Sequence, residues 1–404
     1  MDRRTFSRLM LATAALPALP HAARAVVEWD GITDIARGQT VWWHAWGGDP
    51  KINDFITWVG ELALERYGVT LNQVKIASTA DSVAAVLAER DAGKTKGGSV
   101  DLIWINGENF AAMKREGLLY GPFVENLPNW PLVDMAGKPA VMTDFTLPTE
   151  GYESPWAMAQ LVFEYDSARL TDPPRTIEEL KDWILANPGR FTFPKPPDYL
   201  GVTFLKQVLY GTMPDPSVLQ RPANPATFRR RVAPLRDFLA TVRDALWREG
   251  RAYPENEAAL GQLLADGEID ISFAFNPGRA SAEIAAGTLP DTIRTYTLKG
   301  GTIGNASFVA IPFNSSAKEG AQVIANLLLS PEVQARAQDA SVLGFQTVLN
   351  LAALTEDDRA RFAMLDLGLA TLPPDKMGPA LLEPHASWAT ALADDWTALY
   401  GSGD

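Results

Sequence analysis

The chain has 404 residues, with 47% hydrophobic and 21% charged side chains, a balance typical of a globular protein large enough to form two lobes. It contains no cysteine, which excludes disulfides, thiolate metal sites, a cysteine nucleophile and a lipid-attachment cysteine. Its formal net charge of −13 argues against nucleic acid or an anionic membrane surface as a partner.

Residues 1–25 are typical of an export signal. A twin-arginine pattern at Arg3-Arg4 precedes a short apolar stretch, and small residues fit cleavage after Ala25. A general secretory signal that carries two arginines is the alternative, and either signal would place the mature protein in the periplasm. Removing this segment takes away four arginines and one aspartate and changes the formal charge from −13 to −16. No other segment has the ~20 apolar residues of a transmembrane helix, so we expect no stable membrane insertion.

Strands and helices alternate at the start of the mature chain. Asp49 followed by Pro50 is typical of a helix start, Gly68 would end that helix, and Ser78 would begin the next. This β-α-β-α-β pattern predicts a parallel sheet with right-handed crossovers. The expected strands are residues 40–44, 69–76 and 102–105, and the expected helices are residues 50–67 and 78–92. Their loop–helix junctions would share one edge of the sheet, where small ligands bind in open α/β folds; they are residues 43–48, 78–81 and 106–108.

The second half of the chain is predicted to be mainly helical. Thr176 and Glu179 form a capping box for a helix that continues through Ala186. Helical periodicity returns over residues 227–247 and 256–265, and the last ninety or so residues are amphipathic with a helical period.

Four segments resemble periplasmic solute-binding proteins of the maltodextrin-binding type. Residues 101–123 (DLIWINGENFAAMKREGLLYGPF) resemble the third strand–helix unit of that family, and residues 154–166 resemble the strand by which its chain crosses between lobes. Residues 266–272 resemble the family's turn into a strand that returns to lobe one. The run Pro194–Tyr199 followed by Gly201 is similar to the YnjB-like branch. The resemblance implies an α/β, two-lobed type II fold, with two mixed sheets flanked by helices and a ligand cleft between the lobes.

The resemblance also implies how the chain is divided. Lobe one would comprise residues 26–157 and 277–313, and lobe two residues 158–276 and 314–404. The second and third crossings are expected at residues 275–279 and 300–305, and the C-terminal helices would pack on lobe two. Such a protein would be a monomer that closes on a small-molecule solute and then docks on the permease of an ABC importer.

Residues for hydrolytic or metal chemistry are scarce. After removal of the signal, His44 and His385 are the remaining histidines, which leaves little material for a zinc site or a Ser-His-Asp triad. Acidic residues are abundant, but no pair lies in a recognisable glycosidase motif. We therefore expect no catalytic residues, no metal and no cofactor. An exported carbohydrate-active or ester-cleaving enzyme is the alternative, together with a scaffold that has no small ligand.

Tryptophan is abundant, with twelve in the chain. Tryptophan faces stack on sugars and attract organic cations. Trp42 and Trp104, inside strands, are expected in the core, whereas Trp43, Trp46 and Trp156 could face either the core or the cleft.

The charged groups near the expected cleft leave the ligand open. Trp46 and Tyr199 with nearby carboxylates would suit an organic cation such as thiamine or a polyamine, whereas Arg279, Lys195 and helix N-termini would suit a phosphate or carboxylate group. A zwitterion or a phosphoester would use both, and a sugar-binding transport protein remains an alternative. The predicted ligand contacts are Trp43, Trp46, Thr79, Asp81, Asn106, Glu108, Trp156, Asp198, Tyr199, Asn276, Arg279, Thr302 and Asn305.

Overall fold

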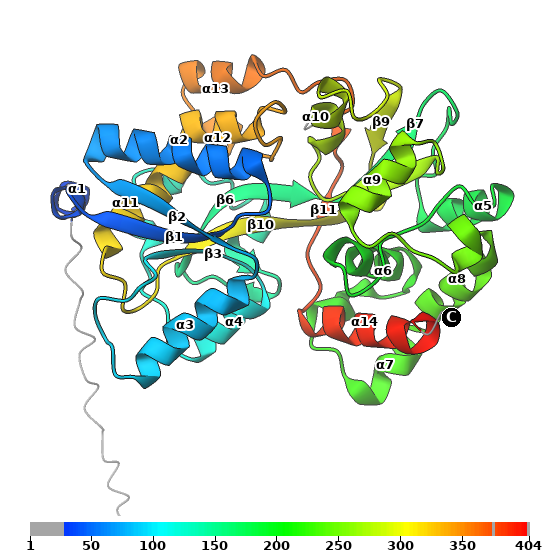
Figure 1. Cartoon of the computed structure of the whole chain (residues 1–404), viewed down its shortest axis with the longest axis horizontal. Helices are drawn as coiled ribbons and strands as arrows, with labels where there is room; N and C mark the ends of the chain where they lie inside the picture. Colours follow the sequence, from blue (N-terminus) through cyan, green and yellow to red (C-terminus); the bar gives the residue numbers. More distant parts are fainter. Residues whose placement is uncertain (1–27, 374–375, 402–404) are drawn as a thin grey trace, which may run out of the picture.

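The computed structural model describes residues 28–373 and 376–401. The predicted export signal lies outside these ranges. The described chain forms two lobes that lie side by side and are joined by strands (Figure 1). No helix in the described ranges combines the length and the apolar character needed to cross a membrane.

The first lobe is built on a six-stranded mixed sheet. Its order is β11-β10-β3-β1-β2, and β6 pairs with β10 as well. The β1, β2 and β3 strands are parallel, which confirms the predicted β-α-β-α-β unit, whereas β10 runs antiparallel to both β3 and β6. The strands are β1 (Thr40–Trp46), β2 (Thr70–Ile76), β3 (Leu102–Ile105), β6 (Glu153–Gln160), β10 (Thr302–Ala310) and β11 (Ala380–Leu381).

Helices cover both faces of this sheet, with α2, α12 and α13 on one side and α3 and α4 on the other (Figure 1). The predicted helix signals are confirmed: the carboxylate of Asp49 accepts a hydrogen bond from the N–H of Lys51, and Gly68 ends α2 at φ 68°. Ser78 caps α3 in the same way. The helices are α1 (Trp29–Ala36), α2 (Pro50–Tyr67), α3 (Thr79–Asp91), α4 (Glu108–Arg115), α11 (Lys318–Leu328), α12 (Pro331–Gln338) and α13 (Glu356–Ala363).

The second lobe surrounds a three-stranded sheet of order β8-β7-β9. All of its ladders are antiparallel, and a single parallel bridge joins Phe191 to Ile271, so the expected second mixed sheet is almost wholly antiparallel. The predicted Thr176 cap is confirmed, since its hydroxyl accepts from the N–H of Glu179. The elements are β7 (Val162–Asp166), β8 (Ile271–Ala274), β9 (Ile293–Tyr296), α5 (Ile177–Ala186), α6 (Tyr199–Thr212), α7 (Pro225–Arg231), α8 (Ala233–Val242), α9 (Glu257–Ala265), α10 (Arg279–Ala285) and α14 (Ser387–Tyr400).

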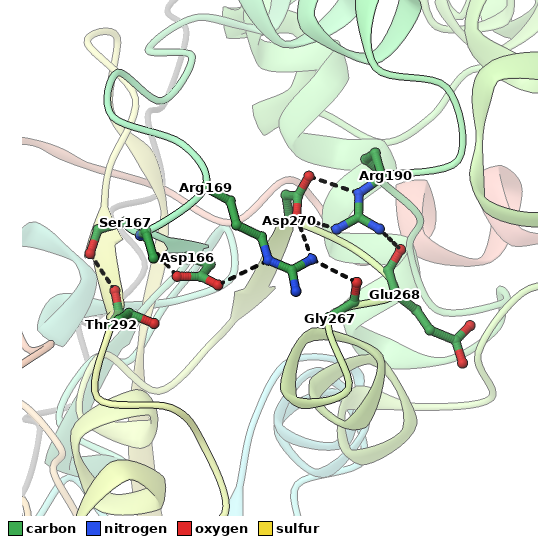
Figure 2. Close-up of polar contacts among 9 residues, drawn as sticks. Asp166, Ser167, Arg169, Arg190, Gly267, Glu268, Asp270 and Thr292 are labelled. Carbon is green, nitrogen blue, oxygen red and sulfur yellow. Dashed lines mark hydrogen bonds and ion pairs between the residues drawn. The ribbon is translucent and has the colours of Figure 1, made fainter.

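An ion-pair network fixes one end of this small sheet. Asp270, just before β8, accepts hydrogen bonds from both Nε and Nη2 of Arg190, with the Nε–Oδ2 distance at 2.8 Å. Arg169 lies between Asp166 at the end of β7 and Asp270, at N–O distances of 3.4 and 3.5 Å (Figure 2). Through Arg169 and Arg190, the carboxylate of Asp270 therefore links the segment before β8 to the end of β7 and to the chain that leads into α6.

The hydrophobic cores divide the chain differently from the predicted boundaries. The core of the large sheet takes residues between 36 and 158 and between 306 and 362, and the core of the small sheet takes residues between 161 and 303 and between 370 and 396. Residues 277–303 therefore pack in lobe two, and α11 to α13 pack in lobe one. The expected crossing at residues 275–279 is wrong, because α10 and β9 stay with the small sheet.

Within the described ranges the chain passes between the two cores at three places. The first lies between β6 and β7, where the sequence predicts it, and the second lies at the start of β10. The third follows α13 and includes β11, whose pairing with β10 was not foreseen. The strand β10 has Ile303 in the core of lobe two and Phe308 in the core of lobe one, so one strand belongs to both cores.

Candidate functional site

A cavity of about 370 Å³ lies between the two lobes. Lobe one lines it with the turn between β3 and α4 and with the short hairpin of β4 (Thr143–Asp144) and β5 (Leu147–Pro148). Lobe two lines it with α6 and α14. The lining residues are Asn106, Gly107, Glu108, Phe145, Pro197, Tyr199, Val202, Lys206, Ala386, Ala389, Thr390, Ala393 and Asp394.

Backbone geometry at Gly107 shapes the lobe-one wall. Gly107 has φ 57°, and a Cβ there would lie 2.7 Å from the ring of Phe145, so a larger residue would displace that ring. Its N–H donates to Oδ2 of Asp144 at 2.6 Å, while the side chain of Asn106 donates to the carbonyl of Ala306 at 2.8 Å. Phe145 itself has φ 53°, a strained value for a residue with a side chain. The turn and the hairpin tip therefore hold each other in place.

Two buried carboxyl groups support this hairpin from behind. Asp144 is 2% exposed and Glu153 is 0% exposed, and the two carboxyl groups lie close enough to interact. Burial raises the pKa of Asp144 to about 8, although the hydrogen bond from Gly107 opposes this. Burial, and then the charge of Asp144, raise the pKa of Glu153 well above its usual range. Burial therefore disfavours the ionised form of each carboxyl group.

A buried ion pair lies at the inner end of the cavity. Nζ of Lys206 on α6 lies 2.6 Å from Oε2 of Glu383, and both side chains are almost fully buried. The other oxygen of Glu383 accepts from the hydroxyl of Tyr199 at 3.1 Å and from Nδ2 of Asn305 at 3.4 Å. Burial and the charge of Glu383 raise the pKa of Tyr199 well above its usual range, which keeps its hydroxyl protonated.

Aromatic rings flank the same ammonium group. Nζ of Lys206 lies 5.4 Å from the ring centroid of Tyr199 and 5.8 Å from that of Phe145. Since Phe145 belongs to lobe one and Lys206 to lobe two, this cation–π contact crosses between the lobes. The hydrogen bond from Asn305 on β10 to the hydroxyl of Tyr199, at 3.0 Å, also ties α6 to the shared strand.

Arg279 is held in a separate cluster at the start of α10. Nη1 lies 2.8 and 3.0 Å from the two carboxylate oxygens of Glu164, and Glu283 and Glu257 complete the cluster at 3.0 and 3.5 Å. Burial raises the pKa of Glu257 to about 7. A Cβ at Gly261 would lie 1.9 Å from the guanidinium, so that glycine makes room for it. The carboxylates neutralise Arg279, and it does not line the cavity, which differs from the anion-binding role predicted for it.

Four of the predicted contact residues converge at the cavity. Asn106, Glu108 and Tyr199 line it, and Asn305 reaches it through its bond to Tyr199. Asp198, just before Tyr199, is the N-cap of α6, and its carboxylate accepts hydrogen bonds from the N–H groups of Leu200 and Gly201.

The other predicted polar residues have local structural partners. The hydroxyl of Thr79 donates to the carbonyl of Trp104, Thr302 is buried and accepts from Gln160, and the amide of Asn276 donates to the carbonyl of Leu343. Asp81 is exposed in the first turn of α3. None of these four lines the cavity between the lobes.

The tryptophans separate into core and surface. Trp43 and Trp156 are 0% exposed and form an edge-to-face pair with centroids 6.2 Å apart, so both lie in the core of lobe one and are not available to a solute. Trp46, at the end of β1, is 44% exposed but does not line the cavity. The prediction that Trp42 lies in the core is wrong, since it is also 44% exposed.

Sequence reasoning missed Phe145, Lys206, Glu383 and Asp394. A signal existed for Lys206, because it is a single cation inside the apolar run of α6, where a buried charge requires a partner. No local signal could pair it with Glu383, which lies 177 residues further along the chain.

The histidines and the carboxylates do not form a metal site in the described ranges. The ring of His44 forms a hydrogen bond with Ser82 at 2.9 Å, and burial lowers its pKa. Nδ1 of His385 accepts from the N–H of Ser387 at the start of α14. Both rings therefore have structural roles.

Comparison with known proteins accounts for this arrangement. The profile of a family described as bacterial extracellular solute-binding protein matches residues 61–363. The chain belongs to this family. It is 41% identical to the protein YnjB of Escherichia coli K12 over 375 residues, which cover 93% of this chain and 94% of YnjB.

Solved structures of transport proteins share the fold. One is the spermidine/putrescine ABC-transporter substrate-binding protein PotD of Streptococcus pneumoniae, with a TM-score of 0.60 at 15% identity over 90% of this chain and 98% of that chain. Another is the periplasmic binding protein AfuA of Actinobacillus pleuropneumoniae with bound fructose-6-phosphate, with a TM-score of 0.57 at 13% identity over 90% of this chain and 99% of that chain. These likenesses establish the two-lobed fold.

Proposed function

We propose that this solute-binding protein is the extracytoplasmic receptor of an ABC importer. It is exported through the signal at residues 1–25, is cleaved after Ala25 and works in the periplasm as a monomer. It captures one small, polar organic solute between its lobes and delivers that solute to the permease. The solute is cationic or zwitterionic, in the class of thiamine-like molecules, polyamines and phosphoesters.

The observation that carries the proposal is a cavity with walls from both lobes. A solute in it would contact the Gly107 turn and Phe145 on one side and α6 and α14 on the other. Contacts that are complete only when the lobes meet favour the closed form, and this differential affinity is what ligand-driven closure requires.

Side-chain chemistry supports the ligand class. Phe145 and Tyr199 add aromatic rings to the lining, and Glu108 of lobe one and Asp394 of lobe two add carboxylates. Such a combination favours an organic cation over a neutral sugar, because the ring quadrupole and the carboxylates both attract positive charge. The polyamine named for PotD agrees with a cationic solute.

A loop contact between the two lobes supports a hinged closure. The amide of Asn276 in lobe two donates to the carbonyl of Leu343, and Gly278 and Gly344 approach so closely that a Cβ on Gly278 would lie 2.6 Å from the Cα of Gly344. Two glycines leave this contact without side chains, so the backbones can pivot on each other.

The test is a thermal-shift screen of residues 26–404 after unfolding and refolding to remove carried-over solute. A ligand at ~100 times its dissociation constant adds roughly 2.7 kcal/mol to the free energy of unfolding, which raises the melting temperature by several degrees. Phe145→Ala should cost ~1–3 kcal/mol of binding, because the Phe145 ring lines the cavity, whereas Trp46→Ala should leave the affinity unchanged, because Trp46 does not line it. A solute that is chemically altered after prolonged incubation would instead favour the exported enzyme.

A further inference from the structure

The lining of the cavity between the lobes includes one buried cation, Lys206, which defines what we call its inner end, and two exposed carboxylates, Glu108 and Asp394, which define its outer end. We propose that the cavity selects a zwitterionic solute, with the anionic group of the solute at Lys206 and its cationic group at Glu108 and Asp394. This inference rests on the proposed function, because it names the class of solute for the same cavity.

The inner end has more hydrogen-bond donors than acceptors. The ammonium of Lys206 has three N–H donors, and in the described part of the chain its acceptor is Oε2 of Glu383. Its other close contacts are the ring faces of Phe145 and Tyr199. Glu383 uses most of its acceptor capacity in contrast, since it accepts from Lys206, Tyr199 and Asn305. The group with spare capacity is therefore a donor, and its natural partner is an oxygen of a carboxylate, a sulfonate or a phosphoester.

The surroundings of Lys206 do not repel an anion. Glu383 and Lys206 form a neutral pair, and burial raises the pKa of the nearby carboxyls of Asp144 and Glu153, which disfavours a negative charge on either. The inner end therefore has close to zero net charge and a surplus of donors.

The outer end has the opposite character. Glu108 begins α4 in lobe one and Asp394 lies on α14 in lobe two, and both side chains are exposed at the cavity. Neither carboxylate forms an ion pair with any residue of the described ranges. Val202, Ala389 and Ala393 add apolar surface to the same lining. A cationic group of the solute would attract both carboxylates, one from each lobe.

Other charge classes fit this arrangement less well. A dication would place one of its charges against the ammonium of Lys206, and a dianion would place one against Glu108 and Asp394. A neutral sugar would leave the spare donors of Lys206 unpaired or bound to water, which weakens its binding relative to a solute that satisfies them. A molecule with one positive and one negative group uses both ends.

The experiment compares probes that differ in one charge. Glycine betaine, carnitine and 4-aminobutanoate are the zwitterions; choline, butylamine and putrescine are the cations; butanoate is the anion, and glucose is the neutral probe. Each is measured by thermal shift and calorimetry on the refolded mature protein. We expect at least one zwitterion to bind, and to bind at least tenfold more tightly than the cation that lacks its carboxylate.

A paired substitution tests the assignment of Lys206. Lys206→Met alone would leave the buried carboxylate of Glu383 unpaired and destabilise the protein. Lys206→Met combined with Glu383→Gln removes the ammonium and the carboxylate together, so the double variant should fold. In this variant the preference for the zwitterion over its matched cation should fall to about twofold. Circular dichroism and the melting temperature without probe establish that the variant is folded.

The outcomes separate the inference from the proposed function. Binding of cations, of the anion or of glucose without binding of any zwitterion overturns the inference and leaves solute binding intact. An unchanged preference in the folded double variant overturns the role of Lys206. A flat response to every probe overturns the inference and counts against the proposed function as well.

Discussion

The buried carboxyls of Asp144 and Glu153 make the stability of the protein depend on pH in a defined direction. Their pKa values are raised above the ordinary 3.8 and 4.5, that of Asp144 to about 8. The folded protein therefore retains protons that the unfolded chain releases, and the free energy of unfolding falls as the pH rises from about 4 to about 8. One retained proton changes that free energy by roughly 1.4 kcal/mol per pH unit, or about 3 kcal/mol between pH 5 and pH 7.

Glu153→Gln tests this prediction with little change of shape. The glutamine carries no charge, and its amide can donate to Asp144. The dependence of the free energy of unfolding on pH should therefore weaken by up to roughly 1.4 kcal/mol per pH unit, which corresponds to one proton. The variant should also be more stable than the natural protein at pH 8. Urea unfolding at half-unit steps from pH 5 to pH 8 measures the slope. Glu61→Gln is the matched control, since Glu61 is exposed on α2 and should leave the slope unchanged. An identical slope for Glu153→Gln and the natural protein would refute the reasoning.

Three further predictions follow from packing and ion pairs. Trp156→Ala should lower the free energy of unfolding in urea by ~3–5 kcal/mol, because Trp156 is 0% exposed and its ring packs against those of Phe55, Trp43, Trp104 and Phe345. The control Trp42→Ala, at a 44% exposed site, should cost less than ~1 kcal/mol. Equal costs for the two variants would contradict the difference in burial. Gly278→Ala should lower the free energy of unfolding by ~1–3 kcal/mol and change the X-ray scattering profile, because the new Cβ would displace Gly344. The control Gly300→Ala should do neither, because its Cβ would meet open space. An unchanged profile and melting temperature for Gly278→Ala would contradict a pivot at this contact. Arg190→Ala should lower the free energy of unfolding by ~1–2 kcal/mol, because it removes the hydrogen bonds to Asp270 (Figure 2). The control Arg251→Ala, which breaks an exposed pair with Glu249, should be nearly neutral. A double-mutant cycle of Arg190→Ala with Asp270→Asn should show the coupling between the two side chains.

Local signals account for the parts of the fold that the sequence predicts well. The caps at Asp49, Ser78 and Thr176 act within a few residues, and the strand–helix alternation of lobe one repeats over a short span. The lobe to which residues 277–362 belong depends instead on long-range pairing, above all on β10 between β3 and β6. No periodicity in one segment specifies its partner in another.

The same reasoning separates the site residues that were predicted from those that were missed. Asn106, Glu108 and Tyr199 follow a strand end or begin a helix, which are places where a sequence alone predicts ligand contacts. The β1 strand has apolar residues in both alternating phases, so its pattern could not decide that Trp43 faces the core while Trp42 and Trp46 face out. Phe145 depends on a strained hairpin tip, and Glu383 on a chain passage that the sequence did not predict.

The strand β10 also determines which pieces of this protein can be studied alone. A fragment that ends after β6 would contain most of lobe one but would lack the strand that separates β3 from β6 in the sheet. Both neighbours would then expose unpaired backbone groups along an open edge, which favours aggregation. A soluble single lobe therefore requires splicing residues 28–160 to residues 302–363 through a designed turn, with β10 kept in its place.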